Sequence, residues 1–168
     1  MEGAALAAHI CGRHTAAVLH RTAGVKDTAG NPLAADDSWS FTTAAAPDTT
    51  PPTVTSRSPA GGASGVALST SVTAGFSELM DSATITGQTV TLAASASPAT
   101  TIAATVSYDS LANRATLTPS SPLAPSTAYT ATVKGGTAGV KDTAGNPLAA
   151  DDSWSFTTAA PPTRRRPR

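Results

Sequence analysis

The string TAGVKDTAGNPLAADDSWSFTTAA occupies residues 22–45, and it returns without a substitution at residues 137–160. A weaker likeness extends upstream, where residues 14–18 align with residues 129–133 and share a Thr, an Ala and a Val. His14 stands there in place of Tyr129. No match is found before about residue 13. Because self-similarity at a fixed spacing is the signature of a repeat protein, the sequence predicts one whole structural unit, preceded by the last part of another copy.

These boundaries divide the chain into five segments. Residues 1–13 match nothing and are predicted to be disordered, and residues 14–46, the front copy, are predicted to be the C-terminal fragment of an upstream repeat. Residues 47–52 form a proline-rich linker, since adjacent prolines are stiff and cannot continue a sheet. Residues 48–159, the complete unit, hold one module from start to finish. Residues 160–168 form a basic tail that is predicted to be disordered.

Apolar residues alternate over short stretches of the complete unit. These stretches predict strands at 53–58, 72–76, 90–92, 102–108, 115–117, 129–133 and 154–156, because a period of two indicates a half-buried strand. Residues 95–100 are predicted to be a hairpin loop, and no window has convincing helical periodicity. The predicted fold is all-β, an immunoglobulin-like Greek-key β-sandwich of about seven strands with a partial N-terminal repeat remnant.

Composition excludes several classes of function. Only 13% of the residues are charged, and the formal net charge is zero. Residues 48–160 hold seven acidic residues against four basic ones. We therefore expect no specific nucleic-acid binding, because phosphate contacts need an excess of Lys and Arg. No apolar run reaches about 18 residues, so we expect no membrane insertion.

The complete unit also lacks the residues of common catalytic systems. Cys11, His9, His14 and His20 all precede it, and it has no other His or Cys. Ser–His and Cys–His nucleophile systems are therefore absent, as are zinc sites built on His and Cys. The unit is predicted not to be an enzyme.

One long stretch carries a family pattern. Residues 51–87, PPTVTSRSPAGGASGVALSTSVTAGFSELMDSATITG, resemble the opening of the SbsA-type bacterial immunoglobulin-like domain, as found in S-layer and other multi-repeat bacterial surface proteins. The matching positions are Pro51, Pro52, Ser58, Pro59, Gly62, Ala63, Gly65, Val66, Phe76, Ser77, Met80 and Asp81. The second half of the pattern is matched by Leu123, Pro125, Tyr129, Asp142, Ala144, Gly145, Asn146, Trp154 and Phe156. The resemblance covers residues 48–159 nearly end to end, and the partial copy at 14–45.

The resemblance implies a non-catalytic structural or spacer module from a repeat-containing bacterial cell-surface or secreted protein. Its partners would be neighbouring immunoglobulin-like repeats, and the parent protein would be extracellular or at the cell surface. The N-terminus has no basic region of the kind that opens a signal peptide, so the export signal is expected outside this chain. The alternative is a ligand-binding module for carbohydrate, cell wall or a protein in adhesion. Carbohydrate sites usually use exposed aromatic rings, and only Tyr108 is a spare large ring, which favours the spacer.

Seven residues are predicted to be structural: Phe76, Leu123, Pro125, Tyr129, Gly145, Trp154 and Phe156. The segment from Leu123 to Tyr129 resembles the tyrosine corner of sandwich folds, in which the hydroxyl bonds a backbone group a few residues upstream. Gly145 is expected to take a positive φ in a turn. Trp154 and Phe156 are expected to face the core from one side of the last strand.

One loop offers metal ligands. Asp142, Asn146, Asp151 and Asp152 supply oxygens of the kind that calcium prefers. Glu78 and Asp81 form a second acidic pair after the second strand of the complete unit. An Asx turn, in which Asp142 bonds backbone amides, competes with calcium and is the favoured interpretation, because Asp, Asn and Gly are common turn formers. We therefore expect no cofactor, with calcium as the alternative.

The front copy predicts a route to self-association. Two strands alone are marginal in water, and residues 38–43 are identical to residues 153–158. We expect the front copy to compete for the last-strand position of a complete unit, within one chain or between two. That exchange is strand-swapped self-association through residues 38–43.

Overall fold

The computed structural model describes residues 15–20, 25–35 and 37–161. The chain forms two compact units, Met1–Pro47 and Asp48–Arg168, of which the first contains the front copy and the second the complete unit. Asp48, which lies in both the predicted linker and the predicted complete unit, is held to the second unit: its carbonyl accepts a hydrogen bond from Asn146 Nδ2 at 3.1 Å. Pro52 is fully buried there. The predicted disordered segments, 1–13 and the tail from 162, lie outside the described residues, as do Cys11, His9 and His14.

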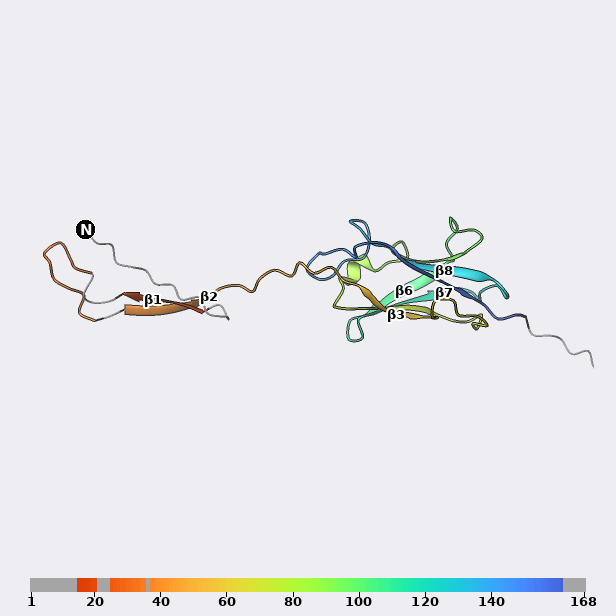
Figure 1. The fold of residues 1–168 in the computed structure, drawn as a ribbon, viewed down its shortest axis with the longest axis horizontal. Coiled ribbons are helices and arrows are strands. Elements are labelled where there is room, and N and C mark those ends of the chain that lie inside the picture. The colour runs from red at the N-terminus through yellow and green to blue at the C-terminus, as the bar shows by residue number, and fades with distance from the viewer. Residues whose placement is uncertain (1–14, 21–24, 36, 162–168) are drawn as a thin grey trace, which may run out of the picture. The chain divides into compact units, whose positions relative to one another are not determined.

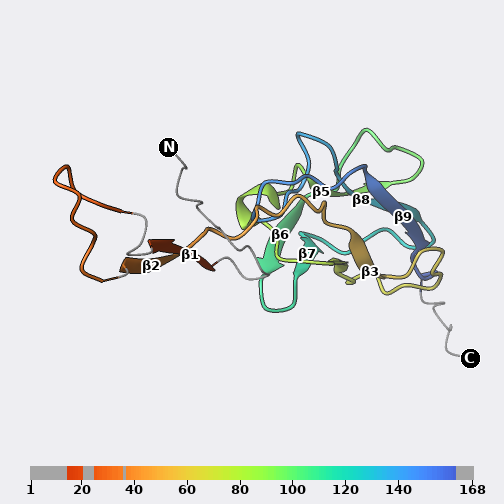
Figure 2. The same ribbon diagram turned by 60° about the vertical axis from the view of Figure 1, so that its left-hand side comes forward.

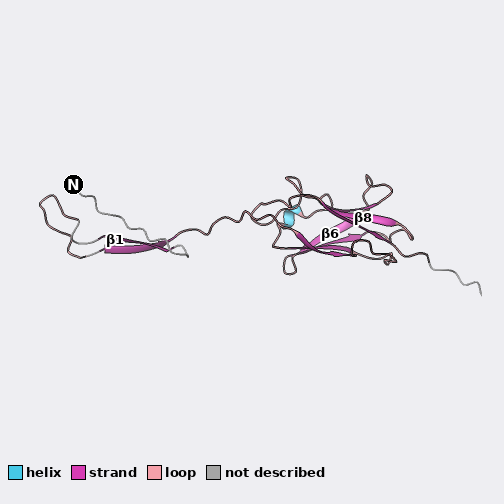
Figure 3. Ribbon diagram, in the orientation of Figure 1, coloured by secondary structure: helices cyan, strands magenta, loops and turns pink. Residues whose placement is uncertain are grey.

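The second unit is built almost wholly of strands (Figure 3). In chain order they are β3 (Val54–Ser58), β4 (Val72–Phe76), β5 (Val90–Ala94), β6 (Ala104–Asp109), β7 (Arg114–Pro119), β8 (Ala128–Val133) and β9 (Asp152–Thr157). One short 3₁₀ helix, η1 (Ser82–Thr84), follows β4. In the described part of the chain, no helix has the length and apolar character needed to cross a bilayer.

The strands of this unit form two antiparallel sheets packed face to face (Figures 1 and 2). The first has the order β3-β4-β7-β6 and the second the order β5-β8-β9. This is the four-plus-three arrangement of a constant-type immunoglobulin domain. The prediction of an all-β immunoglobulin-like sandwich of about seven strands is therefore confirmed.

The connection from β5 to β6 differs from the prediction. Residues 95–100 are not the loop of a hairpin, because β5 pairs with β8 and β6 pairs with β7, in the opposite sheet. A single antiparallel bridge between Ala93 and Thr101 is the only hairpin-like pairing at this place. The chain then crosses between the sheets, and Ile102 lies before β6 rather than within it.

The core lies between the two sheets and contains the large residues that the alternation predicted to be inside. Its members are Val72, Ala74, Phe76, Met80, Ile85, Val90, Leu92, Ala115, Leu117, Leu123, Tyr129, Ala131, Val133, Val140, Leu148, Trp154 and Phe156. The rings of Tyr129 and Phe156 stack with centroids 6.0 Å apart. Phe76 and Tyr108 meet edge to face at 6.4 Å. The β8–β9 connection also contributes, since Val140 and Leu148 are buried.

Among its described residues, the first unit contains a two-stranded hairpin. Strands β1 (Thr15–His20) and β2 (Asp37–Thr42) pair antiparallel, and we call this pair the front hairpin. Its register differs from that of β8 and β9: Val18 stands opposite Trp39, whereas the equivalent Val133 stands opposite Asp152. Trp39 and Phe41 are each 50% exposed.

Candidate functional site

The turn at residues 142–146 lies in the β8–β9 connection and is organised by Asp142. Asp142 Oδ1 accepts hydrogen bonds from the backbone N–H groups of Ala144 and Asn146, both at 2.8 Å. Asp142 Oδ2 accepts one from Asn146 Nδ2, also at 2.8 Å. Gly145 has a φ of 93°, which favours glycine. The geometry is that of an Asx turn, and both carboxylate oxygens already have donors.

These donors set the charge state of Asp142. The side chain is only 1% exposed. Burial alone would raise the pKa of this carboxyl, but the hydrogen bonds from Asn146 and Ala144 outweigh burial and lower the pKa below its ordinary value. Asp142 is therefore an ionised residue that stabilises a turn.

The same turn forms in the front copy. Asp27 Oδ1 accepts from the backbone of Ala29 at 2.9 Å and of Asn31 at 2.8 Å, and Asp27 Oδ2 accepts from Asn31 Nδ2 at 2.9 Å. The hydrogen bond from the Asn31 side chain is the largest cause of the lowered pKa of Asp27. These residues are exposed. The five-residue sequence therefore adopts this turn without burial, and the geometry alone is no sign of a bound ion.

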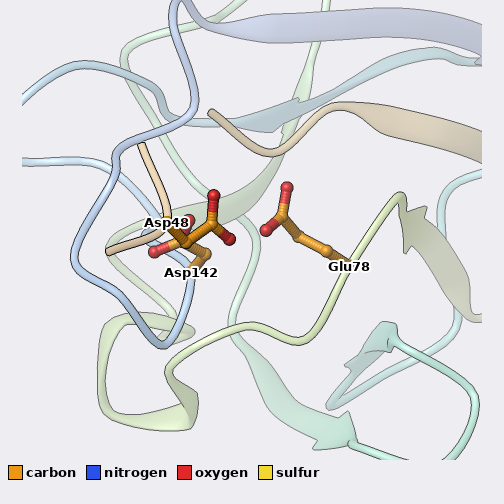
Figure 4. A group of neighbouring side chains, drawn as sticks. All are labelled: Asp48, Glu78 and Asp142. Atoms are coloured by element: carbon orange, nitrogen blue, oxygen red, sulfur yellow. The ribbon is translucent and has the colours of Figure 1, made fainter. Parts of the chain in front are cut away.

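Three carboxylates from distant parts of the chain meet beside this turn (Figure 4). Asp48 precedes β3, Glu78 follows β4, and Asp142 lies in the turn; one carboxylate oxygen from each lies within 4.8 Å of the others. We call these residues the acidic cluster. Burial first, and then the negative charges of Asp48 and Asp142, raise the pKa of Glu78.

The acidic cluster is the place in the complete unit best suited to an oxygen-binding cation such as calcium. Within the described ranges, no other three His, Cys, Asp or Glu side chains approach one another in this way. The three hydrogen bonds to Asp142 compete with any such ion. Among the side chains that the structure describes, no buried polar atom lacks a partner.

The structure does not gather the calcium ligands that the sequence suggested. Asp151 Oδ1 accepts from the backbone of Gly135 at 2.8 Å. Asp152 forms an ion pair with Arg57, whose Nε donates to Asp152 Oδ1 at 2.9 Å. Asn146 donates its amide N–H groups to Asp142 and to the Asp48 carbonyl.

The second suggested acidic pair is also divided. Asp81 Oδ1 accepts from the backbone of Ala83 at 3.0 Å and caps η1, whereas Glu78 joins the acidic cluster. Sequence reasoning missed Asp48 as a partner of Asp142, and no signal in the sequence identifies it, because a residue before two prolines reads as linker.

Five of the seven residues predicted to be structural, Phe76, Leu123, Tyr129, Trp154 and Phe156, are buried in the core, whereas Pro125 and Gly145 are exposed. The Tyr129 hydroxyl accepts a hydrogen bond from the backbone N–H of Ala124 at 2.9 Å, which is the contact of a tyrosine corner. Trp154 Nε1 donates to the Pro59 carbonyl at 2.9 Å. The Arg57 guanidinium lies 5.9 Å from the Trp154 ring centroid. The two Trp154 contacts join β9 to β3 and to the segment that follows β3.

The family of the chain follows from its sequence. Residues 48–158 match the family model of the bacterial Ig-like domain, and the chain belongs to that family. This confirms the resemblance seen in the sequence. No curated protein matches the chain.

Solved structures with a similar arrangement include two of an S-layer protein. The N-terminal part of the bacterial S-layer protein SbsC is 25% identical with a TM-score of 0.49, over 66% of this chain and 24% of that chain. The S-layer protein rSbsC(31–844) is 25% identical with a TM-score of 0.48, over 66% of this chain and 14% of that one. PcoC, a methionine-rich copper resistance protein from Escherichia coli, is 18% identical with a TM-score of 0.47, over 64% of this chain and 97% of PcoC. The chain thus spans less than a quarter of the length of the SbsC chains it matches.

Proposed function

We propose that the complete unit is a non-catalytic spacer module of a repeat-containing bacterial cell-surface or secreted protein. The observation that carries this proposal is that the chain enters and leaves the sandwich at opposite ends (Figure 1). Asp48 is bound to Asn146 at the end where the β8–β9 connection lies. Ala159 accepts from the backbone of Ser126 at 2.9 Å at the other end, where β8 begins. A six-residue strand such as β8 spans about 20 Å, so consecutive modules can follow one another lengthwise.

The pairing between an early segment of the complete unit and its last strand suits a load-bearing element. Residues 62–66 run beside β9: Gly62 N–H donates to the Ser155 carbonyl at 2.7 Å, and Val66 N–H donates to the Thr157 carbonyl at 3.1 Å. Val66 pairs with Thr158 in parallel. Tension applied to the two ends of the unit loads these bonds side by side rather than one after another.

The alternative, a ligand-binding module, has less support. Among the described residues of the complete unit, the large apolar side chains that are exposed are Leu79 and Leu111, and neither is aromatic. The spare ring, Tyr108, packs against Phe76, and its hydroxyl accepts from the backbone of Met80 at 2.9 Å. A sugar would therefore find no free aromatic face on this part of the chain.

A sedimentation experiment tests the proposal. The segment 48–168, which contains the whole core, is mixed with purified bacterial cell walls and with immobilised glycans. We expect it to remain in solution to the same extent as an unrelated sandwich domain of similar charge. Saturable retention that soluble glycan abolishes would contradict the spacer proposal and would favour a ligand-binding module.

A further inference from the structure

The same sequence occupies two different environments in this chain. Trp154 and Phe156 are 7% and 1% exposed, whereas their counterparts Trp39 and Phe41 are each 50% exposed. The local sequence is identical, so the difference in exposure comes from the residues that pack against the strand. In the complete unit the cover is the opposite sheet, β3-β4-β7-β6, together with residues 59–66.

We propose that the front hairpin is a docking surface, and that its partner is the first five strands of a module of this same type, equivalent to β3–β7. The proposal builds on the role in a repeat array proposed above, and it names which part of a neighbouring repeat the front copy binds. The bound state would be a second sandwich, in which β1 and β2 take the positions of β8 and β9.

The complete unit shows the chemistry that such a partner must supply. A backbone carbonyl meets the indole N–H of Trp154, as Pro59 does at 2.9 Å. A backbone N–H meets the carbonyl of Ser155, as Gly62 does at 2.7 Å. An apolar sheet face covers the rings of Trp154 and Phe156. Trp39, Ser40 and Phe41 present the same groups in the same order.

A second copy of this chain is the weaker partner. In every copy the position beside β8 is already filled by β9, whose sequence is that of β2. Exchanging one for the other gains no contact, while association of two chains loses translational and rotational freedom. A polypeptide with β3–β7 and without the last two strands offers an open position.

The register of the front hairpin differs from that of β8 and β9 by two residues. Val18 stands opposite Trp39, two residues from the pairing that Val133 makes with Asp152. A shift of two residues keeps every side chain on its own face of the sheet. Docking therefore requires the hairpin to slide by two residues, so that Val18 comes to stand opposite Asp37.

A titration tests the proposal on the full chain. The probe is the polypeptide 48–127, which carries β3–β7 and no Trp. It is added to the Trp154→Phe variant, in which Trp39 is the sole Trp. We expect Trp39 emission to move to shorter wavelength, and a one-to-one complex in light scattering. Phe41→Ser should abolish both changes, whereas Leu111→Ser, at a 98% exposed residue in the β6–β7 turn, should leave them intact.

A covalent version covers the case in which the free probe aggregates. Residues 48–127 are fused directly in front of residue 13, so that the probe and the front copy form one continuous module. We expect Trp39 to become as protected from acrylamide quenching as Trp154, and a second cooperative unfolding transition to appear. Unchanged Trp39 exposure in the fusion overturns the proposal. A concentration-dependent dimer of the unmodified chain, lost in Phe41→Ser, also overturns it and assigns the surface to a second copy. Neither result bears on cell-wall retention by segment 48–168, so failure of docking and failure of the spacer role are distinguishable.

Discussion

Replacing Trp154 by Ala is expected to lower the free energy of unfolding of the complete unit by about 3–5 kcal/mol, the range for large-to-small changes of buried aromatics. Trp154 is 7% exposed, packs in the core, and donates to the Pro59 carbonyl. It also lies under the Arg57 guanidinium. The variant loses these contacts together and leaves a cavity. Since domains of this kind are stable by about 5–15 kcal/mol, the loss is a large fraction of the total.

The chain contains its own control for this experiment. Trp39→Ala makes the same change within the same sequence, but at a 50% exposed position. We expect it to change the stability of the complete unit by less than about 0.5 kcal/mol, as for most surface substitutions. Urea unfolding followed by far-ultraviolet circular dichroism avoids the altered Trp content. With a slope near 2 kcal/mol per molar, about 4 kcal/mol corresponds to a midpoint shift of about 2 M. Equal midpoint shifts for the two variants would refute the claim that packing against the opposite sheet, rather than local sequence, makes Trp154 important for stability.

Further outcomes are expected for two substitutions, for a change of pH and for calcium. Asp142→Asn should destabilise the complete unit by about 2 kcal/mol, because it weakens charge-assisted hydrogen bonds; Asp27→Asn, the matched control, should leave its urea midpoint unchanged, and equal effects would contradict this. Burial and the neighbouring carboxylates hold the pKa of Glu78 above its ordinary 4.5, so its ionised form disfavours folding. The melting temperature should therefore rise slightly as pH falls through that raised pKa towards 4.5, and Glu78→Gln should remove the rise. At pH values below 3.8 the stability should then decrease. The pKa of Asp142 is lowered in the folded state, so its ionised form favours folding, and this contribution is lost as the pH falls through the folded pKa. Tyr129→Phe should lose about 1 kcal/mol with an unchanged urea slope; no loss would mean that the hydroxyl contact to Ala124 contributes nothing. Finally, millimolar calcium or a chelator should leave the melting temperature unchanged, and a rise with calcium that depends on the acidic cluster would identify a metal site there.

The strands could be predicted from the sequence, whereas one connection could not. Alternation of apolar residues depends only on which face of a strand is buried, so it locates β4, β7, β8 and β9 directly. It carries no information on which sheet a strand joins. The predicted hairpin after β5 is therefore wrong, since pairing of β5 with β8 depends on residues distant in the sequence.

One part of the candidate site could be predicted from the sequence, and the other could not. The Asx turn at Asp142 follows from a local pattern, and it forms in both copies. The acidic cluster depends on the path of the linker, which places Asp48 beside the turn. Asp151 and Asp152 are neighbours in sequence but have different partners, Gly135 and Arg57, because successive residues of an extended chain point in opposite directions.

The opposite placement of the two ends of the complete unit has a consequence for how a gene encoding such units can change. Insertion of one further copy between two linkers leaves every existing sandwich with its own strands and its own core. Each duplication would then extend the reach of the parent protein by one increment, and each deletion would shorten it by the same amount. The two identical stretches, 22–45 and 137–160, are the kind of long direct match at which recombination adds or removes such increments.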